Sequence, residues 1–312
     1  MDAREDLMER LATRWRLDSL ELIGQGLEFT VYRGLARGRR PVVLRLAPRR
    51  FDSNANDPGV DTRALLIQEY EITRHLSGLG FPVAEPVGIH LGNDDGSTPG
   101  GAAGDLPDVL VSRYVDDDGS ALDCHDLGRL LARLHRLPPP PRVLPAATEG
   151  LRGAEVIATR LRRRWNEIGR LVADWPAGPD AALLLSRLAG VTGAGLVHLD
   201  VRSANIRRAH GRTEALLDWS NALLGDATVE FGRLVEYARY PENELDVAAV
   251  RAGYAACAEV PPPDDPALLV CRLDAAVMLA LVFLSEAPDP ERGLPAAAHA
   301  RDLADRLAVG VR

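Results

Sequence analysis

The sequence contains no lysine, so all 37 residues counted as lysine or arginine are arginine. This absence excludes a Walker A phosphate loop, whose lysine reaches the nucleotide phosphates. It also excludes pyridoxal phosphate chemistry and any Schiff-base mechanism, because both need a lysine amine. Any cation that a phosphate site in this protein requires must therefore be an arginine.

Cysteine is scarce, and long apolar runs are missing. The three cysteines, Cys124, Cys257 and Cys271, are far apart and lack the spacing of a metal site, which favours reduced thiols in the cytoplasm. The most apolar stretch, residues 275–284, has about half the length of a membrane-spanning helix. The N-terminal segment is charged throughout, unlike a signal peptide. We therefore expect a cytoplasmic protein that does not cross a membrane.

Positive charge is in deficit, since the 45 acidic residues exceed the 37 basic ones and give a net charge of −8. Nucleic acid is therefore not an expected partner, because phosphate backbones attract concentrated positive charge. An acidic surface suits a cationic small molecule better than an anionic one. A length of 312 residues is enough for two lobes.

The first part of the chain shows strand patterns separated by turns, which indicates an antiparallel meander. Strands are expected at residues 20–23, 29–32, 42–46, 87–91 and 109–115, with helices at the N-terminus and at 65–79. Residues 92–107, rich in Gly, Asp, Ser and Pro, predict a mobile hairpin loop.

A polar break at Asp116–Gly119 separates this part from a helical one. Helical spacing follows at residues 122–137, 152–173, 181–188, 246–258, 266–284 and 294–308. We therefore predict an α+β fold of two lobes, with a β-rich lobe over residues 1–115 and a larger helical lobe over residues 116–312.

The segment from residue 196 to residue 219 carries the clearest chemical signal. Asp200 is followed after four residues by Asn205, and a strand-like segment then leads into Asp218. A short hairpin at residues 209–212 would bring Asp218 back beside the loop. Phosphoryl transfer needs a carboxylate next to the attacking hydroxyl, and oxygen ligands for magnesium that bridges the phosphates. These three side chains provide that set.

The spacing of His198, Asp200 and Asn205 is His-x-Asp-x-x-x-x-Asn, and Asp218 stands between an apolar strand and Trp219. In these features the sequence resembles the aminoglycoside phosphotransferase/choline kinase-like family, which has the protein-kinase fold. The resemblance extends over about residues 22–234. It implies that Asp200 is the catalytic base, and that Asn205 and Asp218 bind Mg²⁺.

The same resemblance implies a nucleotide site in the first lobe, with ATP as the donor and GTP as the alternative. Residues 26–32 are similar to the family's nucleotide loop, although Phe29 replaces its third glycine. Arg45 holds the position of the cation that contacts the phosphates, and Glu69 that of its helix partner, with Glu71 as the nearby alternative. The nucleobase would bond to the backbone of the hinge around residues 112–115. The residues implied in nucleotide binding are Gly24, Gly26, Thr30, Arg45, Glu69, Ser112 and Tyr114.

Some positions depart from the family pattern. Leu199 replaces a residue that is usually glycine and should crowd a tight turn. Arg202 and Ser203 stand where His-Pro or Arg-Pro is common. Ser220 replaces a frequent acidic residue, and Glu230 a frequent aspartate. None of these changes removes an implied ligand.

Several polar residues have a simpler structural interpretation. We expect the imidazole of His198 to brace the loop rather than to react, and His135 to be a hydrogen-bonded core residue. The basic run Arg160–Arg164 is most simply a solvated helix face, with binding of an anionic group as the alternative.

These observations predict an ATP- and Mg²⁺-dependent O-phosphotransferase that acts on a small molecule such as an antibiotic or a hydroxylated metabolite. A nucleotide-binding pseudokinase is the alternative, and a protein kinase is disfavoured because Asp218-Trp219-Ser220 is not Asp-Phe-Gly. We expect a monomer or a homodimer. Acidic residues of the second lobe would suit a cationic acceptor such as an aminoglycoside, namely Glu167, Asp174, Glu236, Glu244 and Asp274.

Overall fold

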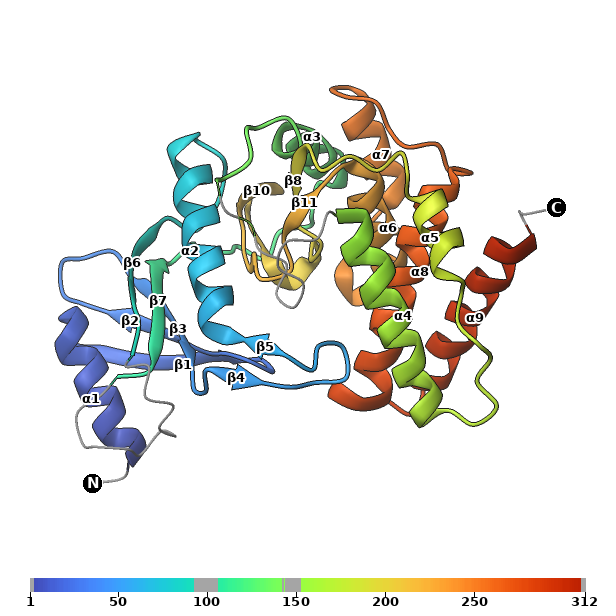
Figure 1. Cartoon of the computed structure of the whole chain (residues 1–312). Helices are drawn as coiled ribbons and strands as arrows, with labels where there is room; N and C mark the ends of the chain where they lie inside the picture. Colours follow the sequence, from blue (N-terminus) through green and yellow to red (C-terminus); the bar gives the residue numbers. More distant parts are fainter. Residues whose placement is uncertain (1–2, 93–105, 142, 144–152, 310–312) are drawn as a thin grey trace.

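The computed structural model describes residues 3–92, 106–141, 143 and 153–309. The chain forms two lobes, a small one built on an antiparallel sheet and a larger helical one (Figure 1). The predicted two-lobed α+β fold is therefore confirmed. The small lobe contains α1 (Ala3–Trp15), β1 (Ser19–Gln25), β2 (Thr30–Leu35), β3 (Val42–Ala47), β4 (Phe51–Asp52), β5 (Val60–Asp61), α2 (Thr62–Gly78), β6 (Pro86–His90) and β7 (Asp108–Arg113).

The main sheet has the strand order β1-β2-β3-β7-β6, and each neighbouring pair is antiparallel. Alternate residues of β3 point to opposite faces, as in any strand. Leu44 and Leu46 pack with Leu11 of α1, whereas Ala47 packs with Leu65 and its neighbours on α2. Arg45 therefore lies on the α2 face of the sheet, toward the second lobe.

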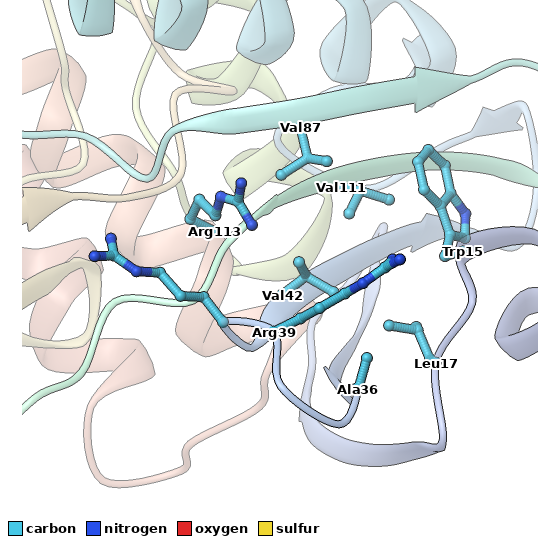
Figure 2. A pocket seen from close by; sticks show the side chains of 9 residues that line it. Trp15, Leu17, Ala36, Arg39, Val42, Val87, Val111 and Arg113 are labelled. Atoms are coloured by element: carbon cyan, nitrogen blue, oxygen red, sulfur yellow. The ribbon is translucent and has the colours of Figure 1, made fainter.

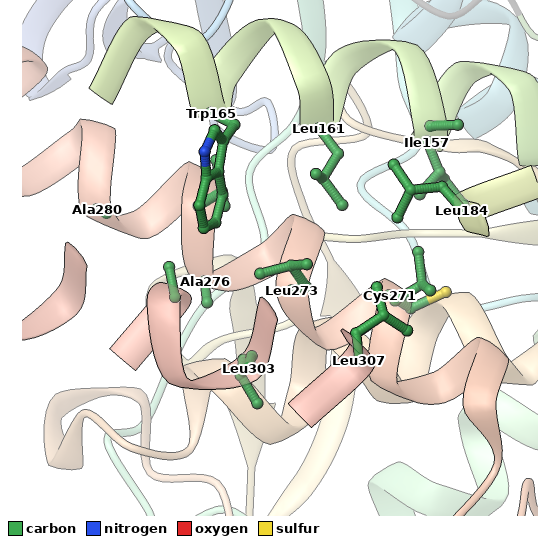
Figure 3. Packing of buried hydrophobic residues seen from close by; sticks show 14 of the residues in the cluster. Ile157, Leu161, Trp165, Leu184, Cys271, Leu273, Ala276, Ala280, Leu303 and Leu307 are labelled. Atoms are coloured by element: carbon green, nitrogen blue, oxygen red, sulfur yellow. The ribbon is translucent and has the colours of Figure 1, made fainter. Parts of the chain in front are cut away.

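The second lobe surrounds the long apolar helix α8. Its elements are α3 (Cys124–Leu134), α4 (Gly153–Leu171), α5 (Ala181–Arg187), β8 (Gly195–Val197), β9 (Ile206–Ala209), β10 (Arg212–Leu216), β11 (Leu223–Gly225), α6 (Ala227–Tyr237), α7 (Val247–Ala255), α8 (Pro266–Leu281), the π-helical turn Val282–Glu286 and α9 (Gly293–Val309). Figure 3 shows Trp165 and Leu161 of α4 directed toward Leu273 and Ala276 of α8. Two short sheets, β8 with β11 and β9 with β10, lie between this core and the small lobe.

Helix α8 with the turn that follows it, Pro266–Glu286, is the one described segment long and apolar enough to cross a membrane. In the structure, 67% of its 18-residue apolar window is buried inside the protein, where it packs against α4, α6 and α9. A central core helix has this composition because it is covered on all sides, so the segment is weak evidence for membrane insertion.

The loop between β4 and β5, residues 53–59, extends from the small lobe onto the helical lobe (Figure 1). Asn56 at its tip donates through its backbone N–H to Glu286 Oε1 at 2.7 Å and through Nδ2 to Met278 O at 3.1 Å. Its carbonyl oxygen accepts hydrogen bonds from Arg163 and Arg164 of α4. The two lobes are thus bonded to each other at a point far along the chain from the hinge.

The predicted helices and strands all appear, with ends that differ by a few residues, but α6 was not predicted. Almost every residue from Val229 to Tyr237 in this helix is buried, and its charged residues Glu230, Arg233 and Glu236 lie in the interior, where a surface helix would present them to solvent. The short pairs β4–β5 and β8–β11 were also missed. Most of the predicted mobile loop, residues 93–105, lies outside the described residues.

Helices α3 and α7 cross where each has a glycine. A Cβ at Gly253 would overlap with the carbonyl oxygen of His125, and one at Gly128 with the carbonyl oxygen of Val250. We expect Gly253→Ala to lower the free energy of unfolding by about 1–3 kcal/mol, the usual range for overpacking. Gly190→Ala is the matched control, because a Cβ there meets nothing within 4 Å. Urea unfolding of both variants measures the difference, and equal stabilities would contradict this account of the crossing.

Candidate active site

The loop between β8 and β9 carries Asp200 and Asn205 and has an unusual backbone. Leu199 has φ of 62°, in the left-handed region that favours glycine. This confirms the expected crowding at this turn. The Leu199 side chain is 1% exposed and belongs to the core around α4 and α8, so its burial offsets the strain.

Glu230 of α6 holds this turn in place. Its two carboxylate oxygens accept from the backbone N–H groups of His198, at 2.6 Å, and Leu199, at 3.0 Å. Burial raises the pKa of this carboxyl group, but neighbouring His135 and the hydrogen bonds outweigh burial, so the net pKa of Glu230 is lowered. The carboxylate therefore remains ionised beneath the loop. Glu230 therefore braces the loop with a side chain that is one methylene longer than the aspartate that is frequent at this position.

His198 braces the loop from the other side. Its Nδ1 accepts from the Asp200 N–H at 3.1 Å, so Nε2 carries the proton and donates to Leu217 O at 3.0 Å. His135 is also a hydrogen-bonded interior residue, with Nδ1 at 3.0 Å from Tyr254 Oη and a side chain that is 5% exposed. Both histidines are structural, as predicted.

Asp200 is a buried carboxylate that is bonded on both oxygens. Oδ1 accepts from Tyr237 Oη at 2.6 Å and from Arg202 Nε at 3.1 Å, and Oδ2 accepts from Asn205 Nδ2 at 2.6 Å. Burial raises the pKa of Tyr237 far above its ordinary value, and the charge of Asp200 raises it further, so this phenol stays protonated and donates. Each carboxylate oxygen can accept two hydrogen bonds, so Oδ2 can still accept a proton.

Asn205 and Asp218 are brought together by the backbone. The N–H of Leu217 donates to Asn205 O at 2.8 Å, which places Asp218 directly after the contact. The hairpin of β9 and β10 turns through His210 and Gly211, both with positive φ, as a two-residue hairpin requires. Asp218 itself has φ of 63°, which turns its side chain away from the course of β10.

Arg45 joins Asp218 to helix α2. Nη2 donates to Asp218 Oδ1 at 2.9 Å, and Nη1 donates to Glu69 Oε2 at 2.7 Å. Glu69, rather than Glu71, is the partner, since Glu71 pairs with exposed Arg74. The guanidinium also lies 4.1 Å above the ring of Phe29, the residue that replaces the third glycine of the nucleotide loop.

The surroundings shift the pKa values of Glu69 and Asp218 in opposite directions. Burial raises the pKa of Glu69 to about 7, although Arg45 lowers it. Burial would also raise the pKa of Asp218, but Arg45 and the Ser220 hydroxyl outweigh burial and lower it to about 2. Asp218 is thus a permanent anion near neutral pH, whereas Glu69 titrates there.

The glycine loop and the hinge lie where the sequence predicts them. Gly24 pairs with Val31, Thr30 begins β2, and a Cβ at Gly24 or Gly26 would approach no protein atom closer than 3.8 Å. Internal packing therefore does not require either glycine. Ser112 lies inside the sheet between Val43 and Pro86. The Tyr114 N–H donates to Pro41 O at 3.0 Å, so this hinge donor is already used within the protein. Their roles toward a nucleotide remain predictions.

The donor set near Asp218 fits a magnesium ion. Asn205 Nδ2 is committed to the backbone and side chain of Asp200, which leaves its Oδ1 as an acceptor. Asp218 Oδ1 accepts from Arg45 and Ser220, and Oδ2 has no protein donor among the described residues. Hard oxygen ligands of this kind suit Mg²⁺, which takes its other ligands from water and phosphate. The described residues contain no group of three or more His, Cys, Asp or Glu side chains that could hold a metal.

A pocket of about 480 Å³ lies elsewhere on the small lobe (Figure 2). Val42 and Val111 form its floor, and Trp15 and Arg113 lie at its sides. Val42 packs with the residues of α1, so this pocket is on the face of the sheet opposite Arg45 and is not part of the site.

The expectation of a solvated Arg160–Arg164 face was wrong. Arg160 binds the buried carboxylate of Asp274 in a bidentate pair, with Nε at 3.0 Å from Oδ1 and Nη2 at 2.5 Å from Oδ2. Arg164, itself 8% exposed, donates to the same group at 3.4 Å. Burial lowers the pKa of Arg164 to about 9, although Asp274 raises it. Arg160 and Arg164 are one helix turn apart, which the sequence shows. Their burial against Asp274, which the sequence did not reveal, gives them a structural role.

The acids that suggested a cationic acceptor are largely neutralised within the protein. Asp274 is surrounded by arginines, and Glu236 is buried between Arg272, at 2.8 Å, and His299, at 2.8 Å. Glu244 pairs with Arg208 at 2.5 Å. Of the five acids, Glu236 and Asp274 are thus buried in ion pairs, whereas Glu244 is half-exposed and Glu167 pairs with Arg170 at the surface.

Four residues of the site were not singled out as functional from the sequence: Glu28, Gln68, Arg233 and Tyr237. Gln68 donates from Nε2 to the carbonyl oxygens of Trp219, Ser220 and Ala222 at 3.2–3.3 Å, which ties α2 to the segment after Asp218. Burial raises the pKa of Glu28 in the glycine loop, and Asp218 adds to this rise. Glu28 lies within the glycine loop without an assigned role, and the other three belong to no sequence motif, so only the approach of separate elements brings them to the site.

Comparison with known proteins identifies the family. Among solved structures, an aminoglycoside phosphotransferase APH(4)-Ia in ternary complex with ADP and hygromycin B has 15% identity and a TM-score of 0.62, over 96% of this chain and 97% of that one. The choline kinase LicA from Streptococcus pneumoniae has 13% identity and a TM-score of 0.58, over 97% and 99%. A macrolide 2'-phosphotransferase type I has 16% identity and a TM-score of 0.56, over 96% and 97%.

These structures share the kinase-like fold with this chain. No curated protein matches it significantly. The model of the phosphotransferase enzyme family, however, matches residues 19–267, from β1 to the start of α8. Because this match covers most of the chain and contains every residue of the site, the chain belongs to the phosphotransferase enzyme family.

Proposed function

We propose that the protein transfers the γ-phosphoryl group of ATP to a hydroxyl group of a small molecule. The observation that carries this proposal is that hydrogen bonds bring Asp200, Asn205 and Asp218 together. Asn205 binds Asp200 through its side chain and Leu217, the neighbour of Asp218, through its backbone, and Arg45 binds Asp218. ADP and AMP-PNP complexes of the similar aminoglycoside phosphotransferase support the nucleotide as donor. A protein substrate has no comparable support.

In this reaction the acceptor oxygen forms a bond to the γ-phosphorus while the bond from that phosphorus to the β,γ-bridging oxygen breaks, and ADP leaves. The hydroxyl proton passes to Asp200, which acts as the general base. Tyr237, Arg202 and Asn205 fix the carboxylate by their hydrogen bonds, so its orientation is set before the acceptor arrives.

Arg45 would bind the nucleotide phosphates from the small lobe, held in place by Glu69. Asn205 Oδ1 and Asp218 would hold Mg²⁺, which when bound neutralises charge on the phosphate oxygens. The low pKa of Asp218, about 2, keeps this ligand ionised at every working pH.

Asp200→Asn tests the base. We expect turnover to fall about 10²–10⁴-fold, because an amide cannot accept the hydroxyl proton. Binding of Mg-ATP, measured by calorimetry, should remain, since Asp200 does not hold the nucleotide in this scheme. ADP release is measured over a panel of aminoglycosides, macrolides, amino alcohols, sugars and hydroxy acids. Asp302→Asn, an exposed aspartate of α9, is the matched control. Undiminished turnover in Asp200→Asn would refute the assignment.

Glu69→Gln tests the pair that positions Arg45. Because the pKa of Glu69 is about 7, protonation below neutral pH removes its attraction for Arg45. We therefore expect the affinity of the wild-type protein for Mg-ATP to fall between about pH 8 and about pH 6. The fall should be about fivefold larger than that of Glu69→Gln over the same range, which is the equivalent of one hydrogen bond. Glu71→Gln, next to exposed Arg74, should keep the wild-type profile. Identical profiles in all three proteins would contradict this role.

The same shift has a consequence for stability. The folded protein binds a proton at Glu69 up to a higher pH than the unfolded chain, whose carboxyl has the ordinary pKa of 4.5. The contribution of Glu69 to stability therefore decreases as pH rises from 4.5 to about 7. Glu69→Gln removes this slope, which pH-dependent urea unfolding measures.

A further inference from the structure

Arg233 is a buried guanidinium without a hydrogen-bond acceptor among the described residues. It lies on α6, one turn before Tyr237, and its side chain is 5% exposed. The nearest carboxylate oxygen, Asp274 Oδ2, is 3.8 Å from Nη2, beyond hydrogen-bond distance. Arg233 thus has only a long ion pair with Asp274 and a ring contact with Tyr237, and none of its nitrogens has a hydrogen-bond acceptor in the described part of the chain. A buried charge is stabilised best when it is also hydrogen-bonded. The position of Arg233 therefore calls for an explanation outside internal packing.

Asp274 cannot satisfy Arg233, because other arginines already occupy it. Arg160 takes both of its oxygens, and Arg164 also donates to Oδ1. Together with Arg202, four guanidinium groups surround only two carboxylates, those of Asp200 and Asp274. The region next to the catalytic carboxylate thus has a surplus of positive charge, although the protein as a whole is acidic.

Arg233 is connected to Asp200 through Tyr237, whereas Arg45 is bonded to Asp218. The Arg233 guanidinium is 5.8 Å from the ring of Tyr237, whose hydroxyl binds Asp200. Burial lowers the pKa of Arg233, but Tyr237, Asp274 and Asp200 outweigh burial, so the net pKa is raised; Asp218 is not among its main neighbours. The charge of Arg233 is therefore linked through Tyr237 to the base, Asp200, and not to the Arg45–Asp218 pair.

The β4–β5 loop covers the other end of the arginine cluster. The carbonyl oxygen of Asn56 accepts from Arg164 Nε at 3.2 Å and from Arg163. The arginines of α4 and α6 thus lie between the catalytic carboxylate and a segment of the small lobe. A group held there is bounded by both lobes.

We propose that the acceptor carries an anionic group, a carboxylate or a phosphate, in addition to the hydroxyl that is phosphorylated, and that Arg233 binds this group. The inference rests on the proposed phosphotransferase function and names its acceptor class. It replaces the cationic acceptor expected from the acidic residues, which are neutralised internally. A guanidinium binds carboxylate or phosphate through paired, charge-assisted hydrogen bonds, so it would fix the distance from the anion to the hydroxyl beside Asp200.

The test uses pairs of acceptors that differ in the anionic group: glycerate and glycerol 3-phosphate each against glycerol, and homoserine against 3-aminopropan-1-ol. ADP release should be faster with an anionic member than with its partner. Arg233→Gln should raise the acceptor KM and lower kcat/KM for that compound about 10–100-fold, the value of a hydrogen bond to a charged group. The KM for ATP should not change, whereas a general structural defect would alter the KM for both substrates. Arg233→Lys should retain part of the activity.

Arg272→Gln is the matched control, because Arg272 of α8 pairs with buried Glu236 of α6 and forms no ion pair with Asp200 or Asp274 in the part of the chain that the structure describes. Its acceptor preference should equal that of the wild-type protein. Turnover of amines or neutral compounds in preference to acids, unaltered by Arg233→Gln, would overturn the acceptor class and leave the phosphotransferase function intact.

If no compound in the larger panel releases ADP, the result counts against the phosphotransferase function itself. A second measurement then tests the anion site at Arg233 separately from that function. Thermal unfolding is followed in sodium sulfate and in sodium chloride of equal ionic strength. Sulfate should stabilise the wild-type protein and Arg272→Gln more than Arg233→Gln, which keeps only the general stabilisation that an excluded salt gives to any folded protein. An equal response of all three proteins would refute an anion site at Arg233.

Discussion

The contacts of Arg45 determine how the two lobes meet at the site. Its guanidinium donates from separate nitrogens to Glu69 on α2 and to Asp218 after β10, so a strand, a helix and the turn at Asp218 converge on one side chain. Gln68, the neighbour of Glu69, binds three carbonyl oxygens just beyond Asp218. The ammonium group of a lysine would have to reach both acids from one nitrogen, whereas the planar fork of arginine reaches them from separate nitrogens and stacks on Phe29. The absence of lysine from the sequence is thus accommodated by a different geometry at the same position.

The loop that carries Asp200 and Asn205 is held in its strained form by buried polar groups. Leu199 and Asp218 both adopt a left-handed conformation that is unfavourable for non-glycine residues. Glu230 binds two successive N–H groups of the loop, and His198 joins the loop to Leu217. Since these groups are inaccessible to water, the loss of one would leave its partner unsatisfied. The orientation of Asp200 and Asp218 is therefore fixed by the core of the second lobe.

Sequence reasoning succeeded where a local pattern has a local cause. The strands of the first lobe, the hairpin at His210 and the spacing of Asp200 and Asn205 are of this kind, because turn chemistry and periodicity act over a few residues. It failed at α6, whose charged residues Glu230, Arg233 and Glu236 lie in the interior and not toward solvent. It also failed to identify Tyr237 and Arg233, since their contacts with Asp200 and Asp274 join parts of the chain that are 37 and 41 residues apart. Long-range packing alone determines these contacts.

The charge of a binding site follows from which charges remain unpaired, and not from the net charge of the chain. This protein has eight more acidic than basic residues, which suggests a cationic ligand. Yet Glu236 and Asp274 are buried and surrounded by arginine or histidine, so they present little negative field to a ligand. Arg233 shares Asp274 with two other arginines and has only a long ion pair with it, so in the proposed acceptor site it is the charge that a bound molecule would meet. The acceptor preference should accordingly follow this single arginine, despite the acidic composition of the whole.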